Sequence, residues 1–342
     1  MKFIKGLFSL ICLIAVFGAA AAVTGWLWMQ HEMAKPGPSL SETVFLVEPG
    51  EGVSAVANRL QRDGIIRNAD LIKIQARIDG TQSAIKSGEF TLPARISMEE
   101  VLSALVDGKA VMHKITLPEG RTTAQLLALI ESNELLVGDM PDPLPAEGEL
   151  LPDTYLFQRG MKRTDLIARI VKSQENLLDE LWPKRQAGLP IKTREEAIIL
   201  ASVVERETGL ASERPEIAGL FTTRLLRGMR LESDPTIIYG ISRGEPLLNK
   251  AGQRRTLYRS EINKKTDWNT YQIDGLPKTP ICNPGRDAIA AVLDPPKTKN
   301  IFFVADGKGG HLFAETLAEH NKNVRAYRRY EREEIARERA GE

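Results

Sequence analysis

The sequence predicts an α+β protein made of an N-terminal transmembrane helix, a small α+β subdomain and a larger mixed α/β domain. An uncharged apolar segment opens the chain, and short β-branched segments then alternate with amphipathic ones. A long, wholly apolar helical segment lies near residue 200. With 342 residues and 42% hydrophobic content, the chain is long enough for two domains that each bury a core.

The first segment is long enough to cross a membrane. Residues 6–30 contain no Asp, Glu, Lys or Arg, and about 20 apolar helical residues cross a bilayer core of roughly 30 Å. Lys2 and Lys5 precede the segment and favour a cytoplasmic N-terminus. A cleaved signal peptide is the alternative, because residues 18–22 offer small side chains to a peptidase. The apolar run continues past them, so we expect an uncleaved single-pass anchor over residues 1–35.

A proline-bearing linker at residues 36–41 leads into the small subdomain, residues 42–110. Its expected elements are a strand at 43–47, a helix from 53 to about 64, a helix at 69–78, a strand at 88–92 and a helix that starts at the capping box of Ser97 and Glu100. Phe90 is the one aromatic residue beyond the first strand, so surface for stacking on sugars is scarce.

The larger domain is expected over residues 111–330, followed by a charged tail at 331–342. Its expected elements are a strand at 113–118, helices at 125–132, 164–182, 193–208 and 217–227, a polar loop at 228–236 with the next element starting at Ile237, and a buried strand at 301–305. The residues from 321 onward have mixed charges, which favours a solvated helix.

The central helix carries the candidate catalytic residue. Thr193 and Glu196 form a capping box ahead of residues 197–204, which are apolar nearly all round and therefore predict a buried helix. Glu205 follows near the helix C-terminus, where burial and the negative end of the helix dipole both raise a carboxyl pKa. Glu207 lies roughly 200° further round the helix and does not share that environment. The alternative is that Glu205 extends into solvent.

Residues 201–240, ASVVERETGLASERPEIAGLFTTRLLRGMRLESDPTIIYG, resemble the core motif of the YceG-like (MltG) endolytic murein transglycosylases. Residues 147–157, 269–277, 283–285 and 302–321 extend the resemblance in the expected order. The small subdomain resembles the LysM-like module that precedes the catalytic YceG-like domain in this family. Its alternative is a spacer that binds no glycan.

The resemblance implies that Glu205, the first Glu of Val204-Glu205-Arg206-Glu207-Thr208, is the catalytic acid/base of a peptidoglycan lytic transglycosylase, a lyase. Such an enzyme cleaves the β-1,4 bond between MurNAc and GlcNAc within glycan strands, forms 1,6-anhydro-MurNAc and ends the elongation of nascent strands. The candidate substrate-binding residues are Asp234, Thr236, Tyr239, Trp268, Asn269, Tyr271 and Asn283. Asp234 and Thr236 could equally be an ordinary helix cap, and residues 266–268 depart from the Ser-Pro-Tyr common in the family.

The number of well-placed carboxyl groups in the sequence agrees with the lytic transglycosylase reaction. Ordinary glycosidases need two carboxyl groups about 5–5.5 Å or 6.5–9.5 Å apart, and the sequence offers one well-placed Glu. No cofactor or metal is expected, since His311 and His320 are too widely spaced for an H-E-x-x-H motif. The two cysteines, Cys12 and Cys282, make no disulfide framework.

The expected partners are peptidoglycan glycan strands and the membrane, with peptidoglycan synthases left open. With 46 basic and 45 acidic residues, the chain has no excess of positive charge that would indicate nucleic-acid binding. We expect the protein in the bacterial inner (cytoplasmic) membrane with its catalytic domain on the periplasmic side. The alternative function is a membrane-anchored peptidoglycan-binding scaffold that is catalytically inert.

Overall fold

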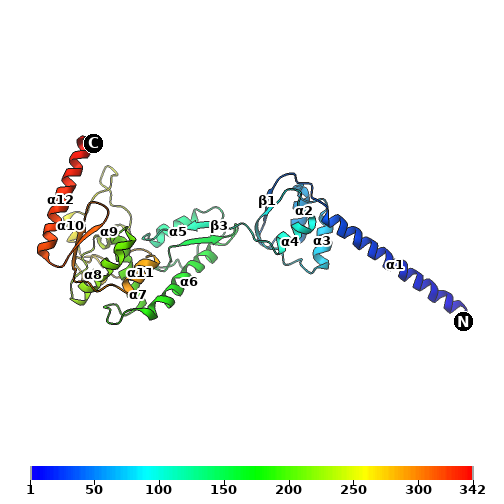
Figure 1. Cartoon of the computed structure of the whole chain (residues 1–342), viewed down its shortest axis with the longest axis horizontal. Coiled ribbons are helices and arrows are strands. Elements are labelled where there is room, and N and C mark those ends of the chain that lie inside the picture. The colour runs from blue at the N-terminus through cyan, green and yellow to red at the C-terminus, as the bar shows by residue number, and fades with distance from the viewer. Residues whose placement is uncertain (1, 341–342) are drawn as a thin grey trace. The chain divides into compact units, whose positions relative to one another are not determined.

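The computed structural model describes residues 2–340 and divides the chain into two compact units (Figure 1). The first unit comprises Met1–His113 with Leu156–Met161, and the second comprises Lys114–Tyr155 with Lys162–Glu342. Met1 and residues 341–342, which belong to the predicted anchor and tail, lie outside the described residues, as do the side chains of Lys2 and Lys5. The mixed α+β class is confirmed.

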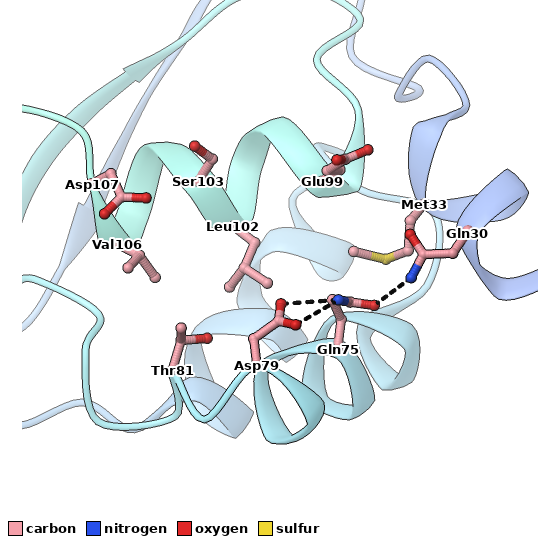
Figure 2. Close-up of a pocket in the computed structure, with 10 residues that line it drawn as sticks. All are labelled: Gln30, Met33, Gln75, Asp79, Thr81, Glu99, Leu102, Ser103, Val106 and Asp107. Atoms are coloured by element: carbon pink, nitrogen blue, oxygen red, sulfur yellow. Dashed lines mark hydrogen bonds between the residues drawn. The ribbon is translucent and has the colours of Figure 1, made fainter. Parts of the chain in front are cut away.

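Helix α1 (Lys2–Ala34) contains the one segment of the described chain that is long and apolar enough to cross a membrane, Cys12–Ala34. Its side chains are exposed along most of this length, and then Met29 and Met33 enter the core of the first unit. Next to them, the Gln30 Nε2 donates a hydrogen bond of 3.1 Å to the Gln75 Oε1, beside a cavity of about 200 Å³ (Figure 2). The apolar helix therefore continues directly into the folded unit.

The first unit is a two-stranded sheet covered by short helices. Its elements are β1 (Thr43–Val47), α2 (Val53–Arg62), α3 (Ala69–Ile78), β2 (Gly88–Leu92) and α4 (Met98–Val106). Strands β1 and β2 are antiparallel with Phe45 opposite Phe90, and both rings are buried. Both strands and α3 occupy the predicted residues, and the capping box of Ser97 and Glu100 is formed, so these predictions are confirmed.

Residues 36–41, predicted as a linker, pack against this unit. The Gly37 N–H donates a 3.0 Å hydrogen bond to the Arg95 carbonyl, and the Arg67 guanidinium donates to the Pro36 carbonyl. A side chain at position 37 would collide with the Ile96 carbonyl. The close approach of two backbone segments therefore requires glycine here.

The second unit is mostly helical, with two small sheets. Strands β3 (His113–Thr116) and β4 (Thr154–Phe157), which pair with each other, belong to this unit only in part, whereas β5 (Phe302–Ala305), which pairs antiparallel with β6 (His311–Ala314), lies wholly within it. Its helices are α5 (Thr123–Glu131), α6 (Arg163–Leu181), η1 (Trp182–Lys184), α7 (Arg194–Glu207), η2 (Ala211–Glu213), α8 (Arg214–Leu226), α9 (Asp234–Ser242), α10 (Arg259–Ile262), α11 (Arg286–Leu293) and α12 (Leu317–Ala340).

Helix α7 lies at the centre of this unit and packs against α8, α9 and α11. Its capping box of Thr193 and Glu196 is formed, and every residue from Ala197 to Glu205 is buried. An apolar helix is stable in this place because neighbouring helices cover it on several sides. The prediction of a buried central helix is confirmed.

Three predictions for this unit are wrong. Helices α8 and α9 begin at Arg214 and Asp234, each three residues before the expected start, because Pro215 and Pro235 suit the first turn of a helix. Strand β5 is only partly buried rather than buried, since it belongs to a two-stranded sheet and packs against α12.

Candidate functional site

Glu205 is held inside the second unit, in the last turn of α7. Its side chain is only 4% exposed. The Gly120 backbone lies beside it, since a side chain added at Gly120 would come within 3.6 Å of the Glu205 Cγ. The alternative that Glu205 extends into solvent is therefore wrong.

Both carboxylate oxygens of Glu205 accept hydrogen bonds. The Arg214 Nη2, from the first residue of α8, donates to Oε1 at 2.7 Å, and the Gly285 N–H donates to Oε2 at 3.1 Å. The two donors hold the carboxyl group in one orientation. The sequence alone does not indicate either donor, because neither is adjacent to Glu205 in the chain.

A second carboxylate shares the same guanidinium. The Arg214 Nη2 also donates to the Glu119 Oε2 at 2.8 Å. The Arg214 side chain is 9% exposed and that of Glu119 is 40% exposed, so Glu119 forms the solvent side of the cluster. Burial, and then the neighbouring charge of Glu205, raise the pKa of Glu119 above its ordinary range. The sequence count of one well-placed Glu therefore needs a correction, since a second carboxylate lies beside it.

The loop that carries Glu119 is fixed at three points. The Gly120 N–H donates to the Asn283 carbonyl at 3.0 Å, and the Asn283 N–H donates to the Arg121 carbonyl at 2.9 Å. From α7, the Arg206 Nη1 donates to the Gly120 carbonyl at 3.1 Å. Gly120 has a φ of +72°, a conformation that favours glycine. The loop is thereby held against both α7 and the segment that leads to Gly285.

Glu119 lines two cavities of the second unit. One, of about 440 Å³, is also lined by residues of α6 and by Arg286. The other, of about 590 Å³, is lined by Asp234 and by the segment from Gly244 to Leu257. Each cavity falls in the usual size range of a small-ligand site. A ligand that occupies either of them reaches the Glu119 side of the carboxylate cluster.

Two of the predicted binding residues lie near this centre. Asn283 is fully buried, and its Nδ2 donates to the Arg121 carbonyl and to the Thr123 hydroxyl. Asp234 is exposed at the second cavity and accepts a 2.8 Å hydrogen bond from the Tyr271 hydroxyl. Asn283 thus holds the loop of Glu119 in place, and Asp234, which is bonded to Tyr271, forms part of a cavity wall.

Tyr239 and Trp268 form a second polar and aromatic group. The Tyr239 hydroxyl donates to the Glu147 Oε2 at 3.1 Å, and its ring meets Trp268 edge-on at 5.8 Å. The Arg243 guanidinium lies 4.0 Å from the centre of the Trp268 ring and covers one of its faces. Burial raises the pKa of Glu147, and burial with the Glu147 charge raises the pKa of Tyr239 to about 12.

Thr236 and Asn269 are fully buried and bond to the protein itself. The Thr236 hydroxyl contacts the Thr270 hydroxyl at 2.9 Å, and the Asn269 Nδ2 donates to the Lys264 carbonyl at 2.7 Å. The first ties α9 to the segment of Thr270, and the second holds the turn before Asn269. The structure therefore places both residues in the supporting framework and not at a cavity surface.

Glu207 has surroundings quite unlike those of Glu205. The residue is partly exposed, but its Oε1 is buried, and the side chain lies beside Ser233. Burial raises its pKa to about 7, and the nearby charge of Asp234 acts in the same direction. The two carboxyl groups of this helix end thus lie in different environments, as the helical period predicts.

The sequence did not identify Glu119 as a member of the site. Arg214, Gly285 and Glu147 stood inside segments that the family resemblance covered, but without a stated role. Glu119 lies in a Pro-Glu-Gly turn far from Glu205 in sequence, and Arg214 begins the next helix. Within residues 2–340, no group of three or more His, Cys, Asp or Glu side chains is arranged to hold a metal ion.

Comparison with known proteins adds independent evidence. The model of the YceG-like family matches residues 45–326. Proteins named endolytic murein transglycosylase from Bacillus subtilis and Streptococcus pneumoniae are 25% and 26% identical to this chain, covering 82% and 81% of it. The alignments span 83% of the first relative and 57% of the second. A crystal structure of a YceG-like protein from Listeria monocytogenes shares the fold, with a TM-score of 0.50 and 24% identity over 82% of this chain and 98% of that one.

Proposed function

Because the chain belongs to the YceG-like family, we propose that it is a membrane-anchored endolytic murein transglycosylase with Glu205 as its catalytic acid and base. The relatives named endolytic murein transglycosylase support the lyase reaction and the peptidoglycan substrate. The observation that carries the assignment to Glu205 is a buried carboxyl group with fixed donors on both oxygens, which shares the Arg214 donor with Glu119, a residue that lines two cavities.

The reaction needs one group that first gives and then takes a proton. Glu205 protonates the glycosidic oxygen that leaves C1 of MurNAc, and the bond between C1 and that oxygen breaks. The acetamido group of the substrate assists at C1. Glu205, now a carboxylate, takes the proton of the C6 hydroxyl as O6 bonds to C1 and closes the 1,6-anhydro ring. The nucleophile belongs to the same sugar, so the reaction consumes no water and gains from high effective molarity.

The test is Glu205→Gln, which keeps the shape of the side chain but cannot exchange the proton. General acid–base catalysis contributes typically about 10²–10⁴-fold, and both half-reactions use the same group, so activity should fall at least that far. The measurement is mass spectrometry of 1,6-anhydro-MurNAc ends released from uncrosslinked glycan strands by the full-length protein in detergent.

Glu195→Gln is the matched control, since Glu195 is exposed at the other end of the same helix. Circular dichroism checks that both variants fold. Near wild-type formation of anhydro ends by Glu205→Gln would refute the assignment. If the wild-type protein binds glycan strands without making anhydro ends, the inert scaffold is the better description.

We further propose that α1 spans the bacterial inner membrane and leaves both units on the periplasmic side. The apolar segment Cys12–Ala34 supports this, together with Lys2 and Lys5 ahead of it and a substrate that lies outside the cytoplasm. A reporter that is active only in the cytoplasm, fused after residue 342, should stay silent. A signal from that reporter would contradict both the topology and the wall substrate.

The first unit precedes the catalytic unit in the chain, as the LysM-like module does in the family. We propose that it positions the catalytic unit near nascent strands. Phe45 and Phe90 are the only aromatic residues in residues 42–110, and both are buried in its core. No aromatic face is thus available there to stack on a sugar, which favours positioning over glycan binding. Cleavage close to the membrane would end strand elongation, and peptidoglycan synthases are the partners that this role would require.

A further inference from the structure

Helix α3 of the first unit lies against the end of the membrane anchor and exposes apolar side chains there. We propose that the outer face of α3, defined by Ile74, Arg77 and Ile78, lies in the outer interface of the membrane and contacts phospholipid. The partner is the lipid bilayer that α1 crosses. This inference rests on the proposed membrane span of α1 and adds a second membrane contact to it.

The join between α1 and the first unit sets the level of α3. Met29 and Met33 of α1 are 7% and 1% exposed and belong to the core of the unit. Between them, the Gln30 Nε2 donates a 3.1 Å hydrogen bond to the Oε1 of Gln75, a residue of α3 (Figure 2). Helix α3 therefore lies beside the last turns of α1 (Figure 1), with Gln75 close to the level of Gln30.

The apolar segment of α1 indicates where the bilayer surface falls. Trp26 and Trp28 are 51% and 56% exposed, and tryptophan is enriched where a span leaves the hydrocarbon core. At 1.5 Å per residue, Gln30 lies about 6 Å beyond Trp26 along the helix. The headgroup layer adds roughly 5–7 Å to each side of the hydrocarbon core. Gln30, and with it the middle of α3, therefore falls within the headgroup layer.

Helix α3 is apolar on two sides. Ile72 and Ala76 are 1% and 0% exposed and pack into the core of the unit. Ile74 and Ile78 lie one turn apart on the other side of the helix and are 46% and 57% exposed. Residues 42–110, all of which the structure describes, expose one further large apolar side chain, that of Val44 in β1. A helix that lies in a membrane interface directs such a face toward the acyl chains.

The neighbouring helix provides a contrast. Helix α4 also packs against the end of α1, but its exposed residues are Glu99, Glu100 and Ser103. Carboxylates and a hydroxyl remain in water at no cost, whereas exposed isoleucines gain free energy when they leave water. Of the two helices that meet the anchor, α3 is therefore the one suited to lipid.

The charges on α3 suit phospholipid headgroups of any net charge. Lys73 and Asp70 form a 2.9 Å ion pair, and the Asp79 carboxylate accepts hydrogen bonds of 2.9 Å from the Gln75 amide. Arg77 is exposed beside the two isoleucines, and its guanidinium has no partner within residues 2–340. An arginine at the edge of an apolar face can extend its charged end to a lipid phosphate. The contact thus combines apolar burial with one phosphate partner.

A second contact would fix the orientation of the first unit. The single helix α1 leaves the unit free to turn about the helix axis and to tilt with it. Insertion of α3 determines which side of the unit faces the bilayer. This gives a physical basis to the proposed role of the first unit in positioning.

The test is the collision rate of a nitroxide spin label with oxygen, which concentrates in lipid, and with a nickel chelate, which stays in water. The label is attached through Ile78→Cys in the full-length protein, reconstituted in phosphatidylcholine nanodiscs. Cys12→Ala removes the exposed native thiol, and the buried Cys282 remains unlabelled. Val44→Cys is the matched control, because Val44 is 59% exposed but lies on β1.

The label at position 78 should collide more often with oxygen than with the nickel chelate, and the label at position 44 should show the reverse. Replacing part of the lipid with phosphatidylglycerol should change the ratio at position 78 by less than about twofold, since apolar burial is the main contribution. Ile74→Glu places a carboxylate in the interface, so it should shift this ratio toward that of position 44. Leu40→Glu, at an exposed position outside α3, should leave the ratio unchanged.

Two results would overturn the lipid contact: a label at position 78 that favours the nickel chelate as strongly as the label at position 44, or a ratio that Ile74→Glu does not move. Phe17→Cys separates this failure from failure of the anchor, because Phe17 lies within the apolar segment and is 67% exposed. A label at position 17 should favour oxygen. If it favours the nickel chelate, the membrane span itself is refuted, and the contact of α3 with it.

Discussion

The two units of this protein differ most in the kind of side chain that they bury. Among the described residues, the only polar side chain buried in the first unit is that of Ser97, which caps a helix. The second unit buries Glu205, Arg214, Arg224 and several amides and hydroxyls. Buried ionisable groups are costly unless they are paired. Their concentration in one unit indicates where the chemistry takes place, and the apolar core of the other indicates a structural role.

The largest expected difference between the units is in the free energy of unfolding that is lost when one partner of an ion pair is removed from each. Arg214→Met leaves the buried Glu205 without its cation, and breaking such a pair costs about 3–5 kcal/mol. Lys73→Met breaks a 2.9 Å pair with Asp70, whose side chain is 79% exposed, and pairs of this kind contribute less than about 1 kcal/mol.

Urea unfolding of the full-length protein in detergent, followed by hydrogen exchange in each unit, measures both costs. Hydrogen exchange is needed because the two units need not unfold together. Equal costs for the two variants would mean that the second unit does not depend on its buried charges.

The sequence predicted the first unit better than the site, and the reason is the range of the interactions. The strands at 43–47 and 88–92 and the capping box of Ser97 depend on neighbours within a few residues, so local patterns reveal them. The apolar run before Glu205 likewise revealed a buried helix.

The contact between Arg214 and Glu119 joins the start of a helix to a distant loop. No hydrophobic periodicity in the sequence predicts such a contact. The family resemblance located Glu205 without its partners. The early starts of α8 and α9 and the partial burial of β5 were missed for a related reason, since cap geometry and sheet size decide them rather than composition.

A smaller difference concerns the pH dependence of stability. The pKa of Glu207 is raised by burial to about 7, so the folded state binds this proton more tightly than the unfolded chain does. Its contribution to stability is full below the unfolded pKa of about 4.3 and is lost as the pH rises through about 7. Glu207→Gln cannot ionise, so at pH 8 it should be more stable than the wild type, by up to about 3 kcal/mol.

Urea unfolding of Glu207→Gln at pH 5 and pH 8, with the exposed Glu195→Gln as control, measures this effect. The hydrogen-exchange signal should assign the gain to the second unit. Identical pH dependence in wild type and variant would show that the Glu207 carboxyl group is solvated in the folded protein.

The smallest expected effects are the losses of stability on removing a helix cap, and these should be equal in the two units. Ser97 caps α4 and Thr193 caps α7, each with a Glu three residues later that returns the hydrogen bond. Because a capping box is a local device, Ser97→Ala and Thr193→Ala should each cost about 1 kcal/mol in their own unit. Thr193 lies at the opposite end of α7 from Glu205, so Thr193→Ala should keep the rate of anhydro-end formation within about twofold of wild type while α7 loses stability. A large loss of activity in Thr193→Ala, with only this small change in stability, would mean that the position of Glu205 depends on the whole length of α7 rather than on Arg214 and Gly285.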